Sequence, residues 1–453
     1  MSSVRFEPAG PLRGSLRPPS DKSISHRAAL IAAMGEGETE IRNYLDAADT
    51  RSTLAAVEEL GAEVELSSAS TVVSVPPEWD GPAPDVDEAP SLGVRIRGVG
   101  LRGVRPATID VGNAGTLLRL LPGWLAGQVG EEWVLDGDES IRRRPVDRIA
   151  IPLREMGADL SAREDRLPPL EVRGAPLHGI TYEMPIASAQ VKSCLLFAGL
   201  LAEGETRLIE PAPSRDHTEQ MLKAAGVSLG REEGTGAIVL QPPEQLQPDD
   251  LLVPADISSA AFFLTAAVLV PESEIELHWV GVNPTRIGLL TILERMMGTE
   301  VEFTKEAESA GERVATLRAR SAPLQATEVG GAEIPLAIDE LPLVALAACF
   351  AEGTTVIRDA EELRRKESDR IETVTAALRA LGGKVEPTAD GMVIEGTGGL
   401  VGGTIESHGD HRIAMLGAVA GLASKEGVEV VGMDAAAVSY PGFEADLASL
   451  LTR

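Results

Sequence analysis

The segment Pro18–Arg27 (PPSDKSISHR) holds residue types that suit the binding of an anion. A lysine, an arginine and serine hydroxyls lie on one short turn, directly before the apolar run Ala28–Met34. If that run is a helix, its first turn offers unpaired N–H groups and a partial positive charge. Ser20 and Asp21 are residue types that cap a helix. A well-capped surface helix without any ligand would look the same, so this turn alone leaves both interpretations open.

Further turns with donor side chains precede apolar helices along the chain. Asp110–Arg119 (DVGNAGTLLR) contains glycines that let a ligand approach the backbone, and Ser188–Ser193 (SAQVKS) carries hydroxyl, amide and ammonium donors. Ser214–Thr218 (SRDHT) precedes the next helix, and Arg142–Pro145 (RRRP) sets three guanidiniums beside a turn. We expect the first two of these arginines to be solvated. The recurrence of such turns favours a shared role in anion binding.

The second half of the chain adds carboxylates. Asp339–Pro342 (DELP) precedes an almost entirely apolar helix, and Arg364–Arg370 (RRKESDR) packs four cations and two acids into seven residues. Ser407–Met415 (SHGDHRIAM) enters the last apolar helix, but its ligand set is incomplete for a metal, and we expect none. Guanidiniums pair with carboxylate and phosphate groups in fork geometry. These segments therefore predict a cleft that binds a multiply charged small molecule and moves protons.

A repeated unit would position these turns. An apolar helix, a polar turn and a short strand recur in six copies, which begin near residues 28, 120, 195, 262, 343 and 414. An amphipathic helix closed by glycine, with an alternating strand after it, follows most of the copies. This recurrence indicates six supersecondary units, split three and three between two α/β domains. An open solenoid is the alternative.

The order of the units predicts where the domains begin and end. The sixth copy lacks a closing strand, so we expect the strand-like Val4–Arg17 to complete it. Both termini then share a domain, and the chain crosses between domains near Leu251–Asp256. The predicted domains are residues 1–20 with 254–453, and residues 21–253. Because basic loops lie on both halves, we expect them to repel in an empty cleft and a ligand to draw the domains together.

Composition excludes several classes of protein. The chain has 453 residues, more than one core usually holds, and a net charge of −29, which opposes nucleic-acid binding. It lacks both a membrane-length apolar run and a leader, and Cys194 and Cys349 have the apolar surroundings of buried thiols. We therefore expect a cytoplasmic monomer without a membrane anchor. Gly98–Gly103 matches GxGxxG, but Pro106 follows where a dinucleotide-binding helix should begin, so we expect no such cofactor.

Eight motifs together resemble the 5-enolpyruvylshikimate-3-phosphate (EPSP) synthase family: PPSDKSISHRA, DVGNAGTLLR, RRRP, ASAQVKS, PSRDHTE, IDELP, RRKESDRI and DHRIAM. They occur in the family's order between residues 18 and 415. The resemblance implies the enolpyruvyl transferase fold, with three βαβαββ units around a pseudo-threefold axis in each domain. It also implies transfer of the enolpyruvyl group of phosphoenolpyruvate to the 5-hydroxyl of shikimate 3-phosphate, with release of phosphate, in the shikimate pathway. This addition–elimination passes through a tetrahedral intermediate and needs no cofactor or metal.

The resemblance further implies roles for individual residues. Asp339 is similar to the base that acts on the 5-hydroxyl, Glu367 to the proton donor for the enol methylene, and Lys22 to a catalytic lysine that reaches both substrates. The implied shikimate 3-phosphate contacts are Lys22, Ser23, Arg27, Ser188, Ala189, Gln190, Arg215, Asp339 and Lys366. The implied phosphoenolpyruvate contacts are Lys22, Gly115, Arg144, Gln190, Arg370 and Arg412.

The chain departs from the family pattern at a few positions. Some members carry a lysine before the C-terminal aromatic–proline, where this chain reads Ala-Val-Ser-Tyr-Pro441, and Ala189, Leu120 and Glu362 replace serine, proline and asparagine of other members. These changes affect single contacts and not the reaction as a whole.

Two other functions remain as alternatives. UDP-N-acetylglucosamine enolpyruvyl transferases use a cysteine on a first-half loop, whereas Cys194 lies in an apolar helix. A non-catalytic anion-binding protein would keep the arginines but would need neither Asp339 nor Glu367. An RNA-end phosphate cyclase shares the architecture, but the net charge of −29 counts against it.

Overall fold

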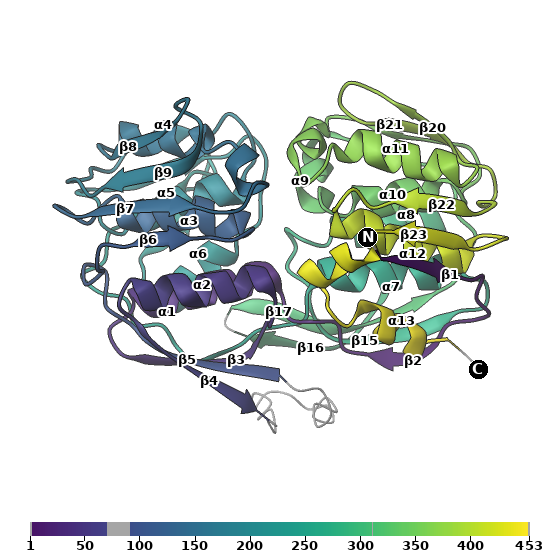
Figure 1. Cartoon of the computed structure of the whole chain (residues 1–453), viewed down its shortest axis with the longest axis horizontal. Coiled ribbons are helices and arrows are strands. Elements are labelled where there is room, and N and C mark those ends of the chain that lie inside the picture. Colours follow the sequence, from purple (N-terminus) through teal and green to yellow (C-terminus); the bar gives the residue numbers. More distant parts are fainter. Residues whose placement is uncertain (1, 70–90, 310, 452–453) are drawn as a thin grey trace.

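The computed structural model describes residues 2–69, 91–309 and 311–451. The chain forms two lobes that lie side by side (Figure 1). The first lobe holds the segment from Lys22 to about Leu240, and the second holds the rest of the chain together with both termini. The lobes join at one end, where the chain passes twice between them (Figure 1).

Three units of alternating strands and helices build the first lobe. Their elements are α1 (Lys22–Met34), β3 (Glu38–Tyr44), α2 (Ala48–Glu59), β4 (Glu63–Ala69) and β5 (Ser91–Arg97); β6 (Thr108–Asp110), α3 (Gly115–Leu125), β7 (Glu132–Asp136), α4 (Asp147–Glu155), β8 (Asp159–Arg163) and β9 (Leu167–Arg173); and β10 (Thr181–Glu183), α5 (Ala189–Gly199), β11 (Thr206–Ile209), α6 (His217–Ala224), β12 (Leu229–Arg231) and β13 (Ile238–Leu240).

The second lobe repeats this plan. Its elements are α7 (Ile257–Leu269), β15 (Glu274–Gly281), α8 (Gly288–Met297), β16 (Glu302–Ser309) and β17 (Glu312–Arg320); β18 (Glu328–Val329), α9 (Ile334–Ala337), α10 (Leu341–Ala348), β19 (Thr354–Ile357), α11 (Arg370–Ala380), β20 (Lys384–Pro387) and β21 (Met392–Glu395); and β22 (Gly403–Glu406), α12 (His411–Ala423), β23 (Val428–Val431) and α13 (Phe443–Ser449). Three further strands, β1 (Ser3–Phe6), β2 (Arg13–Leu16) and β14 (Leu251–Leu252), connect the units.

Within the described residues, five of the six units share one four-stranded sheet topology, and the sixth has a three-stranded sheet of order β22-β23-β1. In the second unit the order is β6-β7-β9-β8, with β6 parallel to β7 and the other two pairings antiparallel. The third and fifth units have the corresponding orders β10-β11-β13-β12 and β18-β19-β21-β20. The repeats predict this alternation of helices and strands, and the family resemblance implies its βαβαββ order. The units form two lobes, so the solenoid alternative is wrong.

The connecting strands partly correct the prediction for Val4–Arg17. β1 pairs with β23 and so completes the sixth unit, as expected. β2 instead pairs in parallel with β15 of the fourth unit, while β14, which follows the third unit, pairs in parallel with β3 of the first. The first and fourth units have no preceding strand of their own. Each therefore receives its parallel edge strand from one of the two segments that cross between the lobes.

The two crossings lie against each other. The backbone N–H of Asp21 donates to the carbonyl oxygen of Pro254, and that of Asp256 donates to Pro19, both at 2.8 Å. Because each crossing ends at the cap of a helix, we propose domain boundaries between residues 20 and 21 and between residues 253 and 254.

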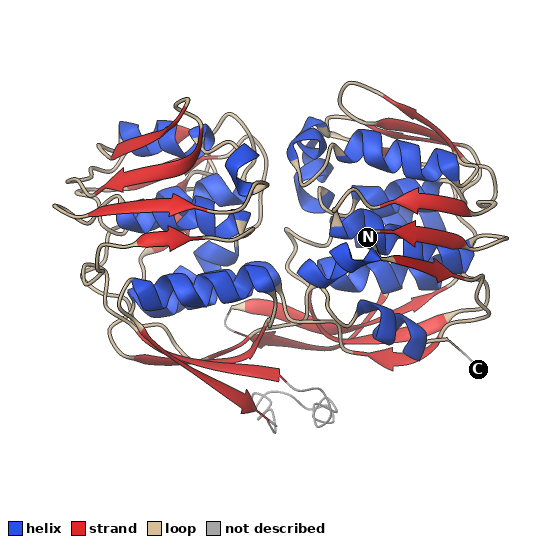
Figure 2. Cartoon of the chain, in the orientation of Figure 1, coloured by secondary structure: helices blue, strands red, loops and turns tan. Residues whose placement is uncertain are grey.

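Buried helices form the core of each lobe. The helices α1, α3 and α5 pack within the first lobe, and α7, α10 and α12 pack within the second, with the sheets over them (Figure 2). Every residue of α7 is buried, as expected for a helix that is apolar on all sides. Cys194 and Cys349 are buried and free, as predicted. Within the described ranges, no helix is long and apolar enough to span a membrane.

Candidate active site

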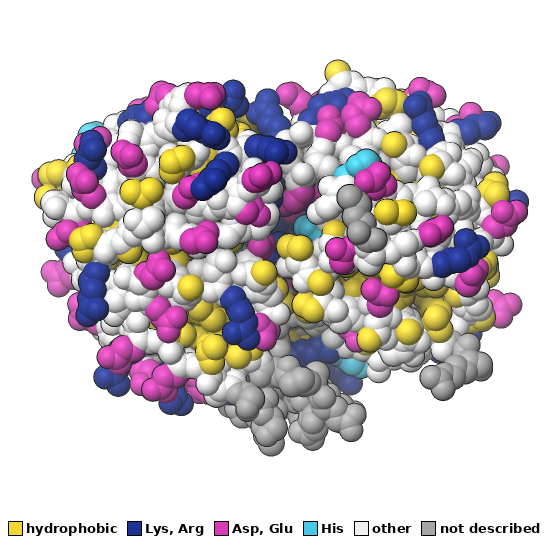
Figure 3. Space-filling view, in the orientation of Figure 1, with side chains coloured by type: hydrophobic (Ala, Val, Ile, Leu, Met, Phe, Trp, Pro, Cys, Tyr) yellow, Lys and Arg dark blue, Asp and Glu magenta, His cyan; other side chains and the backbone are white. Residues whose placement is uncertain are grey.

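The furrow between the lobes deepens into a cleft, and lysine and arginine side chains gather at its rim (Figure 3). Its inner part is a cavity of about 520 Å³. The outer part adds about 1330 Å³ and shares Lys22, Arg144, Lys366 and Glu367 with the inner cavity. All fourteen residues to which the resemblance gives a role line the inner cavity, namely Lys22, Ser23, Arg27, Gly115, Arg144, Ser188, Ala189, Gln190, Arg215, Asp339, Lys366, Glu367, Arg370 and Arg412.

Helix N-termini from both lobes face this cavity. Asp21 caps α1 by accepting a 2.8 Å hydrogen bond from the backbone of Ile24, and Asp410 caps α12 by accepting one of 2.9 Å from Arg412. Ser188 caps α5. The residues just inside these caps line the cavity wall. The positive ends of the helices therefore add to the side-chain cations and favour an anionic ligand.

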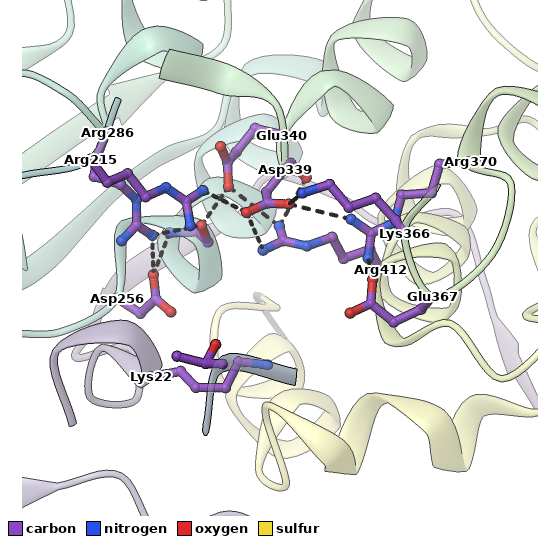
Figure 4. Close-up of polar contacts among 12 residues, drawn as sticks. Lys22, Arg215, Asp256, Arg286, Asp339, Glu340, Lys366, Glu367, Arg370 and Arg412 are labelled. Carbon is purple, nitrogen blue, oxygen red and sulfur yellow. Dashed lines mark hydrogen bonds and ion pairs between the residues drawn. The ribbon is translucent and has the colours of Figure 1, made fainter. Parts of the chain in front are cut away.

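Asp339 lies among four cations (Figure 4). One of its oxygens is 2.5 Å from Arg215 of the other lobe, and the other is 3.2 Å from Lys366 and 3.4 Å from Arg370. Arg412 approaches within 3.9 Å. Burial pushes the pKa of Asp339 upward, but the four cations outweigh it and hold the pKa well below its usual range. Asp339 is therefore an ionised carboxylate in the empty cleft, able to accept a proton once a ligand pairs with these cations.

Glu367 forms a second carboxylate centre in the same cavity. It lies 2.6 Å from Arg370 and 3.8 Å from Arg144 of the first lobe. Burial again favours a higher pKa, yet Arg370 and the neighbouring cations keep the pKa of Glu367 well below its usual range. His411, which also lines the cavity, has its pKa lowered to about 3 by burial and by nearby cations, so its ring is neutral near pH 7.

Asp410 is a site residue that sequence reasoning missed. Its carboxylate is fully buried and accepts hydrogen bonds of 2.9 Å from Arg370 and from Ser368. It therefore fixes the guanidinium of Arg370 between the two carboxylate centres. The sequence did offer one indication of this role: Asp410 directly precedes α12, a position at which an acidic residue caps a helix.

The first anion-binding turn is held by the chain's own side chains. Lys22 lies 3.2 Å from Asp49, a cavity residue that sequence reasoning also missed. Arg27 is buried in the cavity wall, where it donates to the hydroxyls of Thr218 and Ser193 at 2.7 and 3.0 Å. These bonds fix the direction in which its guanidinium points.

Gln190 is oriented by a buried arginine. Its carbonyl oxygen accepts a 2.9 Å hydrogen bond from Arg119, which itself lies at the cavity. Burial, with Arg148 and Arg144 nearby, lowers the pKa of Arg119 to about 10, which still leaves it charged at neutral pH. The amide nitrogen of Gln190 also donates to the hydroxyl of Thr116 at 3.4 Å, which leaves its second N–H for a ligand.

Several other predicted features have clear positions. Arg142 pairs with Asp136 and Arg143 is exposed, as the sequence predicts. Val438, in the run where some family members have a lysine, lines the outer cleft. Glu362, in place of asparagine, forms a 2.9 Å ion pair with Arg148 across the two lobes. Among the described residues, no group of three or more histidine, cysteine or acidic side chains is arranged to hold a metal ion.

Lys192 of the SAQVKS turn points away from the cleft. Its ammonium is fully buried, 2.8 Å from Glu219 and 3.1 Å from Glu210, and it donates to the backbone of Ser214 next to Arg215. It therefore anchors the Arg215 loop from behind.

Replacing Lys192 by methionine will lower the stability of the first lobe. Glu219 loses the ammonium that pairs with it, while Glu210 keeps Arg231 at 3.1 Å, and a buried carboxylate left without its partner costs about 3–5 kcal/mol. Burial already raises the pKa of Glu219 against the pull of Lys192, and the substitution will raise it further. At a pH above the raised pKa of Glu219, the variant loses the full amount of unfolding free energy. As the pH falls below that pKa, Glu219 takes up a proton, the buried charge disappears and the loss becomes smaller. Thermal unfolding of Lys192→Met at pH 8 and pH 5 will measure this, with the exposed Lys223→Met on α6 as control; an equal loss at both pH values would contradict it.

The repeated βαβαββ units and the cation-rich cleft define a transferase of the two-domain enolpyruvyl transferase fold. A solved structure titled EPSP synthase from Acinetobacter baumannii superposes with a TM-score of 0.83 at 38% identity, covering 100% of this chain and 98% of that one. Residues 6–447 match the family model described as EPSP synthase (3-phosphoshikimate 1-carboxyvinyltransferase). The chain belongs to the EPSP synthase family.

Curated relatives agree with this assignment. A protein of Synechococcus sp. (strain RCC307) is 47% identical, with 99% of each chain covered, and is named 3-phosphoshikimate 1-carboxyvinyltransferase. A protein of Gloeobacter violaceus with the same name is 48% identical, with 97% of each chain covered. The prediction of family and of two-domain fold from the eight motifs is thus confirmed.

Proposed function

We propose that this enzyme transfers the enolpyruvyl group of phosphoenolpyruvate to the 5-hydroxyl of shikimate 3-phosphate, releasing phosphate, as a step of the shikimate pathway. The observation that carries the proposal is the placement of Asp339 and Glu367, each between cations of both lobes, in one cavity. Both substrates carry a phosphate and a carboxylate, which is the chemistry that several converging guanidiniums bind.

The two carboxylates divide the proton transfers between them. Glu367 protonates the methylene carbon of phosphoenolpyruvate, so that its C2 becomes cationic in character. Asp339 accepts the proton of the 5-hydroxyl as that oxygen bonds to C2. The tetrahedral adduct then breaks its C2–O bond to phosphate, which takes up the proton from Asp339, while Glu367 recovers a proton from the methyl carbon. Bound substrate anions pair with the surrounding cations and so raise the pKa of both carboxyls toward the working range.

The family resemblance gives the assignment of the substrate contacts, and the lining of the inner cavity supports it. We assign the shikimate 3-phosphate site to Lys22, Ser23, Arg27, Ser188, Ala189, Gln190, Arg215, Asp339 and Lys366, which all line the inner cavity. We assign the phosphoenolpyruvate site to Lys22, Gly115, Arg144, Gln190, Arg370 and Arg412, which line it as well.

Replacing Gly115 by alanine will weaken phosphoenolpyruvate binding. A Cβ at this position would lie 2.5 Å from a terminal nitrogen of Arg144, so the guanidinium must move. The end of an arginine moves easily, and we expect KM for phosphoenolpyruvate to rise about tenfold, roughly 1.4 kcal/mol, with kcat little changed. Steady-state kinetics will test this against Gly230→Ala on β12, where a Cβ meets nothing within 4 Å and φ is not positive. An unchanged KM would remove Gly115 from the assigned site.

Both halves of the site come from one chain, which supports a monomer as the working form. The two cysteines are free and buried, which fits a reducing cytoplasm. We propose a cytoplasmic monomer that uses no cofactor and binds no nucleic acid. Sedimentation at micromolar concentration with both substrates will give one species of about 48 kDa if this is correct, consistent with the chain mass of 47.6 kDa.

Phosphate release is the direct test of the reaction. We expect release from phosphoenolpyruvate only when shikimate 3-phosphate is also present. Release with UDP-N-acetylglucosamine instead would support the other enolpyruvyl transferase, but Cys194 is buried and burial raises the pKa of its thiol, which opposes that role. Binding of both substrates without release would indicate a non-catalytic anion-binding protein.

A further inference from the structure

The two crossings between the lobes carry the same residue pattern. Both read Pro-x-Asp-x-Ser, at Pro19–Ser23 and at Pro254–Ser258. Asp21 caps α1 and Asp256 caps α7, each by accepting a 2.8 Å hydrogen bond from a backbone N–H of the first turn. Because the crossings are hydrogen-bonded to each other, the starts of one helix from each lobe lie together.

One buried guanidinium, that of Arg286, lies between these helix starts. Its Nη1 atom is 3.0 Å from Asp21 and 3.1 Å from Nε2 of His217, both in the first lobe. Its Nη2 atom is 3.0 Å from Asp256 and donates to Ser258 at 2.9 Å, both in the second lobe (Figure 4). The Nη1 arm of the guanidinium therefore binds acceptors of the first lobe, and the Nη2 arm binds acceptors of the second lobe.

The surroundings of Arg286 hold it in this position. Because Nη1 donates to Nε2 of His217, the ring carries its proton on Nδ1, which donates to Glu312 at 2.6 Å. Glu312 also accepts a 2.9 Å hydrogen bond from Asn283. Burial favours a higher pKa for Asp21, but Arg286 and nearby cations lower it to about 2, so Asp21 faces Arg286 as a carboxylate.

From the Nη2 arm, a chain of polar contacts continues to the turn Asp339–Glu340, which holds the proposed base. The hydroxyl of Ser258 donates to Glu340 at 2.5 Å, and Glu340 is 3.3 Å from Arg412. Arg412 in turn donates to the backbone carbonyl of Asp339 at 2.9 Å. Glu340 is almost fully buried, so it is a fixed part of this path. On the first arm, Asp21 caps the helix that begins with Lys22.

We propose that Arg286 is a positioning residue, which holds the Lys22 end of α1 at a fixed distance from the catalytic turn Asp339–Glu340. Arg286 lies at the wall of the inner cavity, and in this role it acts through Asp21 on one side and through Ser258 and Glu340 on the other. A lysine could not replace it, because a single ammonium lacks the two arms that reach acceptors in both lobes. The inference rests on the reaction proposed above, in which Lys22 and Asp339 act on the same pair of substrates.

A double-mutant cycle between Asp21→Asn and Ser258→Ala tests this coupling. Asparagine keeps an oxygen that can cap α1, and alanine keeps the backbone N–H that Asp256 binds. We expect each single variant to lower kcat about tenfold, and the double variant to lose little more than either one, because both break the same link. Losses that multiply to about a hundredfold, or single variants with wild-type kcat, would overturn the proposal.

Three further measurements separate positioning from simple stability. The affinity for shikimate 3-phosphate should change little in both single variants, while kcat falls even well below each variant's thermal midpoint; a loss of kcat that only follows the fraction of unfolded protein would show a merely structural role and overturn the proposal. Arg286→Lys should lower kcat, whereas Arg318→Lys, on the exposed ion pairs of β17 with Glu276 and Glu302, should not. Absence of turnover in the wild type would refute the proposed reaction. Additive losses in the double-mutant cycle would refute only the role of Arg286, so the two failures can be told apart.

Discussion

Asp339→Asn will lower kcat for phosphate release by about 10²–10⁴-fold, while shikimate 3-phosphate still binds. Asparagine has nearly the same shape but cannot take the proton of the 5-hydroxyl. The substitution also removes a negative charge from between four cations, so the empty cavity becomes more positive. Affinity for the anionic substrate should therefore stay the same or increase. Single-turnover phosphate release and titration calorimetry with shikimate 3-phosphate will measure the two effects separately.

A matched substitution outside the cleft gives the control. Asp165→Asn, on the exposed hairpin between β8 and β9, removes a carboxylate whose partner is Arg154 and should leave both quantities unchanged. Retention of more than a tenth of wild-type kcat in Asp339→Asn would identify another group as the base. Loss of shikimate 3-phosphate binding together with turnover would assign Asp339 to binding alone.

The sequence predicted best those structural features that depend on residues close together in the chain. Each anion-binding turn joins a cap residue, a donor side chain and an apolar helix within about ten residues, so its structure is decided locally. The turns at Lys22, Gly115, Ser188 and Arg412 are at helix starts, and all of them line the cavity. The second, third and fifth units were predictable for the same reason, because each is one continuous segment.

Pairings between distant segments could not be predicted from local pattern. The exchange of β2 and β14 between units depends on which sheet edge is free, and the partners of Arg286 come from separate segments of both lobes. The expected repulsion between basic loops left out the carboxylates that lie among them, because these come from the other lobe. Arg215 and Arg148 of the first lobe pair with Asp339 and Glu362 of the second. That a ligand draws the domains together stays a prediction.

Glu367→Gln will remove proton transfer to the enol carbon and lower kcat by about 10²–10⁴-fold. In deuterated water, the wild type should place deuterium in the methylene group of the product, since the methyl carbon of the adduct gains one hydrogen from solvent and then loses any of three. Glutamine cannot supply that hydrogen. Arg370 and Arg144, which lie beside Glu367, remain to bind phosphoenolpyruvate, so its affinity should be retained.

Mass spectrometry of the product, compared at equal turnover, separates the possible donors. Glu372→Gln, on the exposed side of α11, should incorporate deuterium like the wild type, because Glu372 pairs only with Arg364 among the described residues. If Glu367→Gln keeps wild-type kcat and incorporation, the donor is another group, and His411 is the titratable side chain beside it. Burial and nearby cations lower the pKa of His411 to about 3, so it holds no extra proton to give near pH 7. Because that ring is neutral, our proposed acid of the reaction stays Glu367, whose pKa the bound substrate anions raise.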